Sequence, residues 1–185
     1  MRVISGERRG LKLFSLEGED TRPTLDRVKE SLFNILDSKY VNYEYVLDLF
    51  SGSGALGIET LSRGASKVVF CDKSKLAIDI IRKNIEKAKY IDKSDILNED
   101  YITSLEKLYN KQKKFDIIFL DPPYNKGMGI NAIEFISKYN LLKDDGIIVL
   151  ETNEEEYIPE KIGIYEIIDE RKYGKVRVYL YKWKE

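Results

Sequence analysis

The sequence predicts an α/β domain whose sheet is doubly wound and mostly parallel. Apolar strand-like runs alternate with amphipathic helical patterns from Val46 onward, and a glycine-rich turn follows the first run. Strands that alternate with helices form parallel sheets covered on both faces. The last two runs flank Tyr173-Gly174 without a helix between them, so we expect the sheet to end in an antiparallel strand pair.

A chain of 185 residues suits one domain with a small N-terminal appendage. Short apolar alternations around two glycine turns in residues 1–14 predict a hairpin. The apolar spacing from Pro23 to Leu36 predicts a lead-in helix. We therefore expect a substrate-side appendage at residues 1–40 and the main domain at residues 41–185.

The remaining elements follow from hydrophobic periodicity and from helix-end signals. Ser74 is the expected N-cap of one helix, and Gly64 is expected to close the helix before it. The expected strands are 46–50, 67–71, 95–97, 115–120, 146–150, 165–169 and 175–183, and the expected helices are 55–63, 75–88, about 102–108 and 130–138.

Composition excludes several classes of function. The chain has no histidine and a single cysteine, Cys71, which excludes Ser-His and Cys-His triads and an internal disulfide, and we expect no metal site. The apolar runs are far shorter than the ~20 residues that span a bilayer, and no secretory signal is visible, so we expect a cytoplasmic protein without membrane contact. With a net charge of −1, a polyanion would need a local basic patch.

A glycine-rich turn is the first motif that carries chemistry. Gly52, Gly54 and Gly57 form a Gly-x-Gly-x-x-Gly between a strand and a helix, where bare glycines let a ligand approach backbone N–H groups. Asp72 ends the next strand, twenty residues after Gly52, where a carboxylate can accept both hydroxyls of a ribose. The combination predicts an adenosine-containing cofactor; the alternative is a tight turn and a helix-flanking acid.

Asp48 distinguishes between cofactors. It lies four residues before Gly52, and a pyrophosphate beside the loop would be repelled by roughly 3 kcal/mol at ~5 Å and an effective dielectric of 20. S-adenosylmethionine carries an ammonium and a sulfonium in place of phosphates, so the same carboxylate would be a favourable neighbour. A loop-bracing or capping role for Asp48 is the alternative.

The second motif, Asp121-Pro122-Pro123-Tyr124, directly follows the strand 115–120, at the edge where open α/β sheets bind ligands. An exocyclic amine becomes nucleophilic when its two hydrogens are accepted, here by Asp121 and the Pro122 carbonyl. Tyr124 offers a face on which a base can stack, which is worth ~1 to 3 kcal/mol. A proline-rich exit turn with a core tyrosine is the alternative.

These motifs together resemble the class I methyltransferases that act on exocyclic nitrogens, which have a Rossmann-like fold. Further segments resemble the RsmD family, whose members methylate guanine N2 in 16S ribosomal RNA. The resemblance implies S-adenosylmethionine as the cofactor, and 16S ribosomal RNA or the small ribosomal subunit as the partner. The segments that carry it are Met1-Arg2-Val3-Ile4-Ser5-Gly6, Thr21-Arg22-Pro23-Thr24, 27–33, Gly54-Ala55-Leu56-Gly57-Ile58-Glu59, 61–65 and Tyr173-Gly174.

The resemblance also implies a role for each matching position. Either Glu99 or Asp100 would contact the adenine amine, because both acids lie at similar reach. Thr24 and Arg27 would meet the methionine carboxylate, although an N-cap and a solvated arginine explain them equally well. The other implied cofactor residues are Asp48, Ser51, Gly52 and Gly54 at the methionine end and Asp72 at the ribose, and the implied catalytic residues are Asp121, Pro122 and Tyr124.

The N-terminal hairpin is the predicted RNA contact. It carries Arg2, Arg8, Arg9 and Lys12 against Glu7, a local excess of +3. A solvated hairpin face is the alternative interpretation.

Two other functions stay open from the sequence. The Asp121-Pro122-Pro123-Tyr124 motif is shared with adenine-N6 methyltransferases of DNA and RNA. A binding module that holds a nucleotide and RNA without turnover is the second possibility. A protein-glutamine methyltransferase is disfavoured, because related enzymes have Asn where this chain has Asp121.

Overall fold

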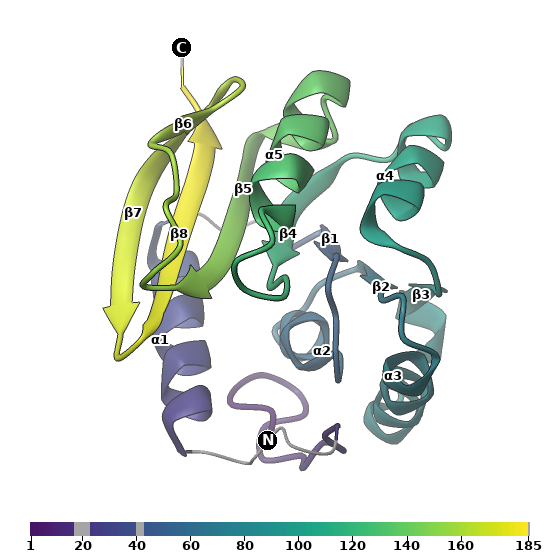
Figure 1. The fold of residues 1–185 in the computed structure, drawn as a ribbon. Helices are drawn as coiled ribbons and strands as arrows, with labels where there is room; N and C mark the ends of the chain where they lie inside the picture. The colour runs from purple at the N-terminus through teal and green to yellow at the C-terminus, as the bar shows by residue number, and fades with distance from the viewer. Residues whose placement is uncertain (17–22, 40–42, 185) are drawn as a thin grey trace.

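Eight strands form a single mixed sheet in the computed structural model, which describes residues 1–16, 23–39 and 43–184, without the side chains of 23–25 and 39 (Figure 1). The strand order is β3-β2-β1-β4-β5-β8-β7-β6. The strands β1 to β5 pair in parallel, and β8 pairs antiparallel with β5 and β7. The strand bounds are β1 Tyr45–Asp48, β2 Lys67–Cys71, β3 Ser94–Leu97, β4 Phe115–Leu120, β5 Leu142–Asn153, β6 Lys161–Ile162, β7 Tyr165–Tyr173 and β8 Val176–Trp183.

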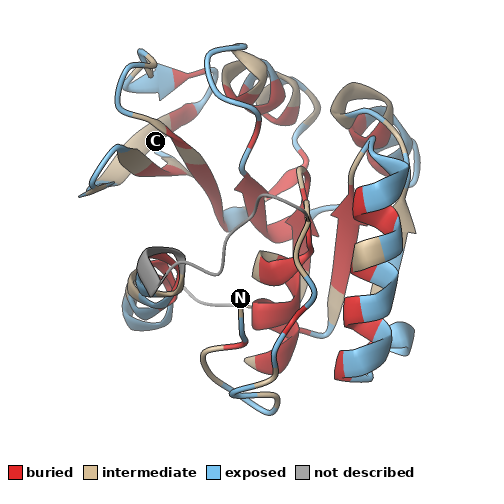
Figure 2. Ribbon diagram, turned by 60° about the horizontal axis from the view of Figure 1, so that its bottom comes forward, coloured by how far each residue is buried: buried red, intermediate tan, exposed pale blue. Residues whose placement is uncertain are grey.

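Helices cover both faces of the sheet. Alternate strand residues point to opposite faces, so Val46 packs in the cluster with α1, α2 and α3, and Leu47 packs in the cluster with α4 and α5. Figure 2 shows buried residues along the strands and on the inward sides of the helices. No helix in the described ranges has the length and apolarity that a bilayer span requires. The helices are α1 Pro23–Lys39, α2 Ala55–Ser62, α3 Lys75–Ala88, α4 Tyr101–Asn110 and α5 Met128–Tyr139, with a 3₁₀ turn at Ile91–Lys93.

The predicted fold class is confirmed, and most element bounds agree within a few residues. Ser74 caps α3 as expected, since its Oγ accepts the Ala77 N–H at 3.3 Å. The short strand β6 was not expected, and the first strand ends at Asp48 and not at Phe50. β5 extends to Asn153 because its far end pairs with β8, a contact that local periodicity does not reveal.

The N-terminal segment folds back on itself as predicted, but with one isolated bridge, between Arg2 and Lys12. The Val3 N–H donates to Leu11 O at 2.9 Å, and the Gly10 N–H donates to Val3 O at 2.8 Å. Val3 lies in the same core cluster as α1 and the sheet. The division of the chain at residue 40 stays a prediction.

Candidate active site

A cavity of about 520 Å³ opens at the carboxyl edge of the parallel strands. Its walls are residues at and after the carboxyl ends of β1 to β5, the start of α2, one side of α1, and Met1. The chain builds β1, β2 and β3 outward in one direction and then crosses to β4 on the other side of β1. Crevices for ligands form where strand order reverses in this way, so the fold places the cavity at its ordinary binding edge.

The glycine loop has the backbone conformation that its sequence requires. Gly52 and Gly54 have φ values of +54° and +79°, in the left-handed region that favours glycine. A Cβ on Gly57 would lie 2.3 Å from the Phe70 ring, so this glycine lets α2 pack closely on β2. Ser51 ties the loop to both strands, since its Oγ donates to Asp48 O at 2.6 Å and accepts the Cys71 N–H at 3.0 Å.

Asp48 lines the cavity and also braces the loop. Its side chain is 2% exposed, and its Oδ2 accepts the Gly57 N–H at 3.1 Å. Burial raises the pKa of Asp48 to about 7, and the nearby charge of Asp72 adds to the increase. A cation in the cavity would stabilise the ionised carboxylate.

Asp72 likewise combines a wall position with a structural role. Its Oδ2 accepts the Gly52 N–H at 2.9 Å, and its Oδ1 accepts the Ser74 N–H at 2.8 Å. Each carboxylate oxygen can accept a second hydrogen bond, so both remain able to accept ribose hydroxyls.

Glu99 and Asp100 both line the cavity but differ in how they are engaged. Asp100 caps α4, accepting the Ile102 and Thr103 N–H groups at 3.1 Å each and the Thr103 hydroxyl at 2.6 Å. The hydrogen bonds from Thr103 hold the pKa of Asp100 below its usual value. Glu99 pairs with Lys107 through Oε1, while its Oε2 is buried without a hydrogen-bond partner among the described residues.

The residues of the second motif lie in the part of the cavity wall that follows β4. Asp121, Pro122 and Tyr124 all line the cavity. The Tyr124 ring is 40% exposed, and its hydroxyl donates to Glu151 Oε1 at 3.4 Å. Burial raises the pKa of Tyr124, and the charges of Glu151 and Asp121 raise it further. Sequence reasoning missed Glu151, although it follows the predicted strand 146–150 at the same edge as Asp121.

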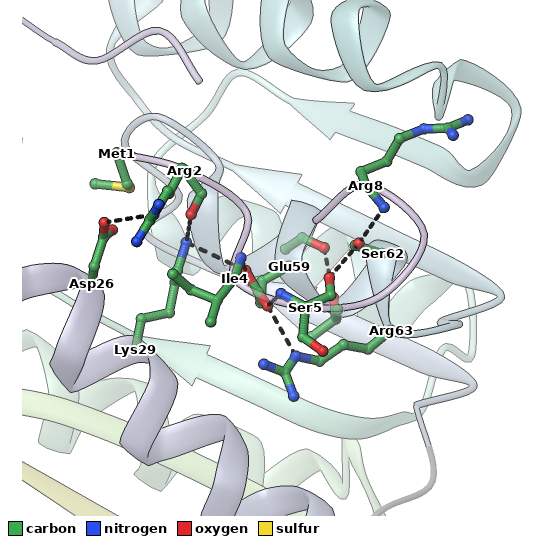
Figure 3. A network of polar contacts seen from close by, with 12 residues as sticks. Met1, Arg2, Ile4, Ser5, Arg8, Asp26, Lys29, Glu59, Ser62 and Arg63 are labelled. Atoms are coloured by element: carbon green, nitrogen blue, oxygen red, sulfur yellow. Dashed lines mark hydrogen bonds and ion pairs between the residues drawn. The ribbon is translucent and has the colours of Figure 1, made fainter. Parts of the chain in front are cut away.

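A buried ionic network holds the N-terminal segment against the cavity wall (Figure 3). Glu59 of α2 is 0% exposed and accepts the Ile4 N–H at 2.8 Å and the Ser5 N–H at 3.0 Å. It also accepts Arg63 Nε at 3.0 Å and lies 3.4 Å from Lys29 Nζ. Burial lowers the pKa of Lys29, and the charge of Glu59 opposes that shift.

Lys29 connects this network to the cavity. Its Nζ donates to Arg2 O at 2.5 Å, and the residue lines the cavity together with Met1. Neither residue was a sequence candidate, because a lysine on a helix gives no local sign of its distant partner.

The predicted RNA-binding residues lie outside the cavity lining. Arg2 pairs with Asp26 at 3.5 Å. Arg8 is turned toward the protein, since its Nε donates to Ala88 O at 2.8 Å. Arg9 and Lys12 are exposed.

Three predicted cofactor residues are not among the described residues that line the cavity. Gly54 shapes the loop without lining the cavity, and Arg27 lines a separate hollow with Arg171. The Thr24 side chain and the Thr21-Arg22 part of the resembling segment lie outside the described residues. The other five predicted cofactor residues, Asp48, Ser51, Gly52, Asp72 and Asp100, lie together in the cavity wall.

The chemistry of the cavity wall fits S-adenosylmethionine. Among the described lining residues, six carboxylates face two lysines, Lys29 and Lys73, so the wall favours a cationic ligand. The sulfonium and ammonium of S-adenosylmethionine meet this requirement, whereas the pyrophosphate of a dinucleotide does not. Phe50 and Tyr101, whose ring centroids are 5.3 Å apart, add an aromatic wall that suits an adenine.

Comparison with known proteins identifies the family. The family model described as Conserved hypothetical protein 95 matches residues 1–182. The chain belongs to this family. A Bacillus subtilis member named Putative rRNA methyltransferase YlbH is 37% identical, with 98% of each chain covered. A Haemophilus influenzae member named Ribosomal RNA small subunit methyltransferase D is 37% identical over 98% of this chain and 93% of its own.

A solved structure supports the same assignment. The Putative methyltransferase yhhF from Escherichia coli superposes with a TM-score of 0.84 at 28% identity, covering 100% of this chain and 98% of its own. The resemblance to the RsmD family and to class I methyltransferases is therefore confirmed.

Proposed function

We propose that this member of the Conserved hypothetical protein 95 family transfers a methyl group from S-adenosylmethionine to the exocyclic N2 of a guanine in 16S ribosomal RNA. One observation carries the proposal: an acid-lined cavity of about 520 Å³ has the glycine loop on one wall and Asp121, Pro122 and Tyr124 on another. A methyl donor and an amine acceptor can therefore meet in one space.

At the donor end, Asp48 and the loop backbone at Ser51 and Gly52 hold the methionine portion, and Asp72 accepts the ribose hydroxyls. Glu99 or Asp100 accepts the adenine amine. When bound, S-adenosylmethionine supplies an electrophilic methyl group, whose bond to sulfur breaks as the bond to nitrogen forms.

At the acceptor end, the target base stacks on Tyr124. Asp121 and the Pro122 carbonyl accept the two amine hydrogens, which directs the nitrogen lone pair toward the donor. Asp121 then takes the proton that the methylated nitrogen loses. Holding both reactants in line can remove ~7 to 11 kcal/mol of the barrier, so positioning supplies most of the acceleration.

The RNA lies across the exposed basic residues of the N-terminal segment, principally Arg9 and Lys12. The relatives named ribosomal RNA small subunit methyltransferases support the small ribosomal subunit or its RNA as the partner. Such a substrate assigns the protein to the cytoplasm.

Nucleoside mass spectrometry of small-subunit ribosomal RNA tests the proposal. We expect N2-methylguanosine to disappear from cells that lack the protein and to return with the wild-type gene but not with an Asp121→Ala gene. Purified protein should transfer tritiated methyl groups to RNA from the deficient cells. Loss of N6-methyladenosine, or no change in any nucleoside, would overturn the proposal.

A further inference from the structure

Asp121, directly after β4, and Glu151, near the end of β5, lie side by side at the cavity wall. Leu120 of β4 is paired with Leu150 of β5 in the parallel register, so Asp121 and Glu151 follow at the same level. Neighbouring strands lie about 4.8 Å apart. Both residues line the cavity, and the charges of both raise the pKa of Tyr124. The Tyr124 hydroxyl is therefore close to both carboxylates.

The Glu151 side chain makes few polar contacts with the rest of the described chain. Within the described part of the chain, its side chain has one hydrogen-bond partner, the Tyr124 hydroxyl at 3.4 Å, and no ion pair. A carboxylate can accept about four hydrogen bonds, so Glu151 retains acceptor capacity at the cavity wall. Glu151 is partly buried, so a donor on the substrate would add a hydrogen bond that the protein itself does not supply.

We propose that Glu151 selects guanine by accepting the N1–H of the target base while Asp121 and Pro122 accept the N2 amine. This proposal rests on the proposed function and adds the residue that determines which base is used. Guanine presents N1–H directly beside its N2 amine, so two adjacent acceptors on the protein match two adjacent donors on the base.

The other amine-bearing bases do not match this arrangement. Adenine has an acceptor, N1, beside its N6 amine, and cytosine has an acceptor, N3, beside its N4 amine. Their lone pairs would face the Glu151 carboxylate, leaving two acceptors opposed without a hydrogen. Sites built around a specific polar partner reject a ligand that lacks it far better than apolar pockets reject an extra methylene.

The discrimination depends on ionised Glu151, because a protonated carboxyl group could donate to N1 of adenine. Burial raises the pKa of Glu151 by removing water from its charge, which favours the protonated form. A hydrogen bond from N1–H would replace that missing solvation, because hydrogen bonds to a carboxylate are about twice as strong as neutral ones.

The test varies both the target base in the RNA and the side chain at position 151. The substrates are small-subunit particles reconstituted from RNA that carries either guanine or 2-aminopurine at the methylated position, which nucleoside mapping locates first. 2-Aminopurine keeps the N2 amine but has an acceptor at N1. The enzymes are the wild type, Glu151→Gln and a control, Glu155→Gln. Glu155 is exposed and lies in the turn that follows β5.

Wild type and the control should prefer guanine by roughly 10- to 100-fold in kcat/KM. Glu151→Gln can donate an amide hydrogen to N1 of 2-aminopurine, so its preference should fall to about one or reverse. Comparing the two ratios cancels the effect of the O6 that 2-aminopurine also lacks. Circular dichroism should give the same spectrum for all three proteins, which verifies that each is folded.

An unchanged preference in Glu151→Gln, with guanine still methylated, would overturn the role of Glu151. Equal losses on both bases would also overturn it, because they would mean that Glu151 only positions Tyr124. Failure of the wild type to methylate the guanine particle at all would instead refute the proposed function.

Discussion

The Oδ2 atom of Asp72 accepts the Gly52 amide hydrogen at 2.9 Å, which joins the end of β2 to the glycine loop that follows β1. One side chain therefore fixes the loop and borders the cavity. Changes at Asp72 should affect cofactor binding both directly, through the ribose, and indirectly, through the loop.

Asp72→Ala should weaken S-adenosylmethionine binding by roughly 1.5 to 3 kcal/mol, because charge-assisted hydrogen bonds to the ribose are lost. Isothermal titration calorimetry measures the change. Asp79→Ala, an exposed substitution on α3, serves as the control and should leave the affinity unchanged. Tighter binding of NAD than of S-adenosylmethionine by the wild type would contradict the cofactor assignment.

Asp121→Ala should abolish methyl transfer while S-adenosylmethionine affinity falls much less, since the carboxylate acts on the target amine during the reaction. Single-turnover rates and calorimetry separate the two effects. Asp121→Asn should retain measurable activity if a neutral acceptor suffices. Parallel losses of affinity and rate would place Asp121 in the cofactor site.

The affinity for S-adenosylmethionine should fall about tenfold from pH 8 to pH 6. Burial raises the pKa of Asp48 to about 7, and the cationic ligand requires the ionised form, so a proton must be displaced at the lower pH. In Asp48→Asn this pH dependence should disappear. Identical pH profiles for the two proteins would show that Asp48 does not face the cation.

The same shift predicts a change in stability of defined sign. Between about pH 4 and pH 7 the folded state holds a proton on Asp48 that the unfolded state has released, so this group lowers the free energy of unfolding as pH rises. Relative to wild type, Asp48→Asn should therefore become more stable as pH rises through this window. Urea unfolding at several pH values measures the difference.

Glu59→Gln should lower the free energy of unfolding by about 3 to 5 kcal/mol, because it leaves Lys29 and Arg63 without their buried counter-ion. Adding Lys29→Met should restore part of the loss, since the double variant no longer buries that unpaired ammonium. Glu30→Gln on the exposed side of α1 is the matched control. Strict additivity of the two changes would argue against their coupling.

Replacing Arg9 and Lys12 by Glu should reduce the slope of log affinity for RNA against log salt by about 1.4 to 1.8, at ~0.7 to 0.9 per phosphate contact. Lys111→Glu with Lys114→Glu, exposed changes after α4 on the opposite face of the sheet, should leave the slope unchanged. Fluorescence titration with a ribosomal RNA fragment gives both slopes. Equal slopes in the two double variants would remove the N-terminal segment from the RNA site.

The parallel sheet and much of its edge could be predicted, because hydrophobic period and helix-end signals are local. Asp72 and Asp121 each follow a predicted strand, Asp48 lies in the predicted strand 46–50, and parallel strands bring such residues to one edge. Glu151 lies at the same edge, but it comes directly after the predicted end of its strand and belongs to no motif.

Local sequence patterns could not predict contacts between segments that are distant in the chain. Arg8 was expected to meet RNA, yet it donates to Ala88 O, eighty residues away in the chain. Lys29 lies among helical residues of ordinary spacing, and only the folded structure brings Glu59 and Arg2 O to its Nζ.

The attachment of the N-terminal segment to Glu59 also sets an order of events during synthesis. The Ile4 and Ser5 amides precede their acceptor by 55 and 54 residues. At a translation rate of 5 to 20 residues per second, Glu59 is synthesised roughly 3 to 11 s after these two amides. The N-terminal segment therefore stays without these hydrogen bonds until α2 has been translated. The part of the cavity wall that Met1 and Lys29 form can be completed only after that step.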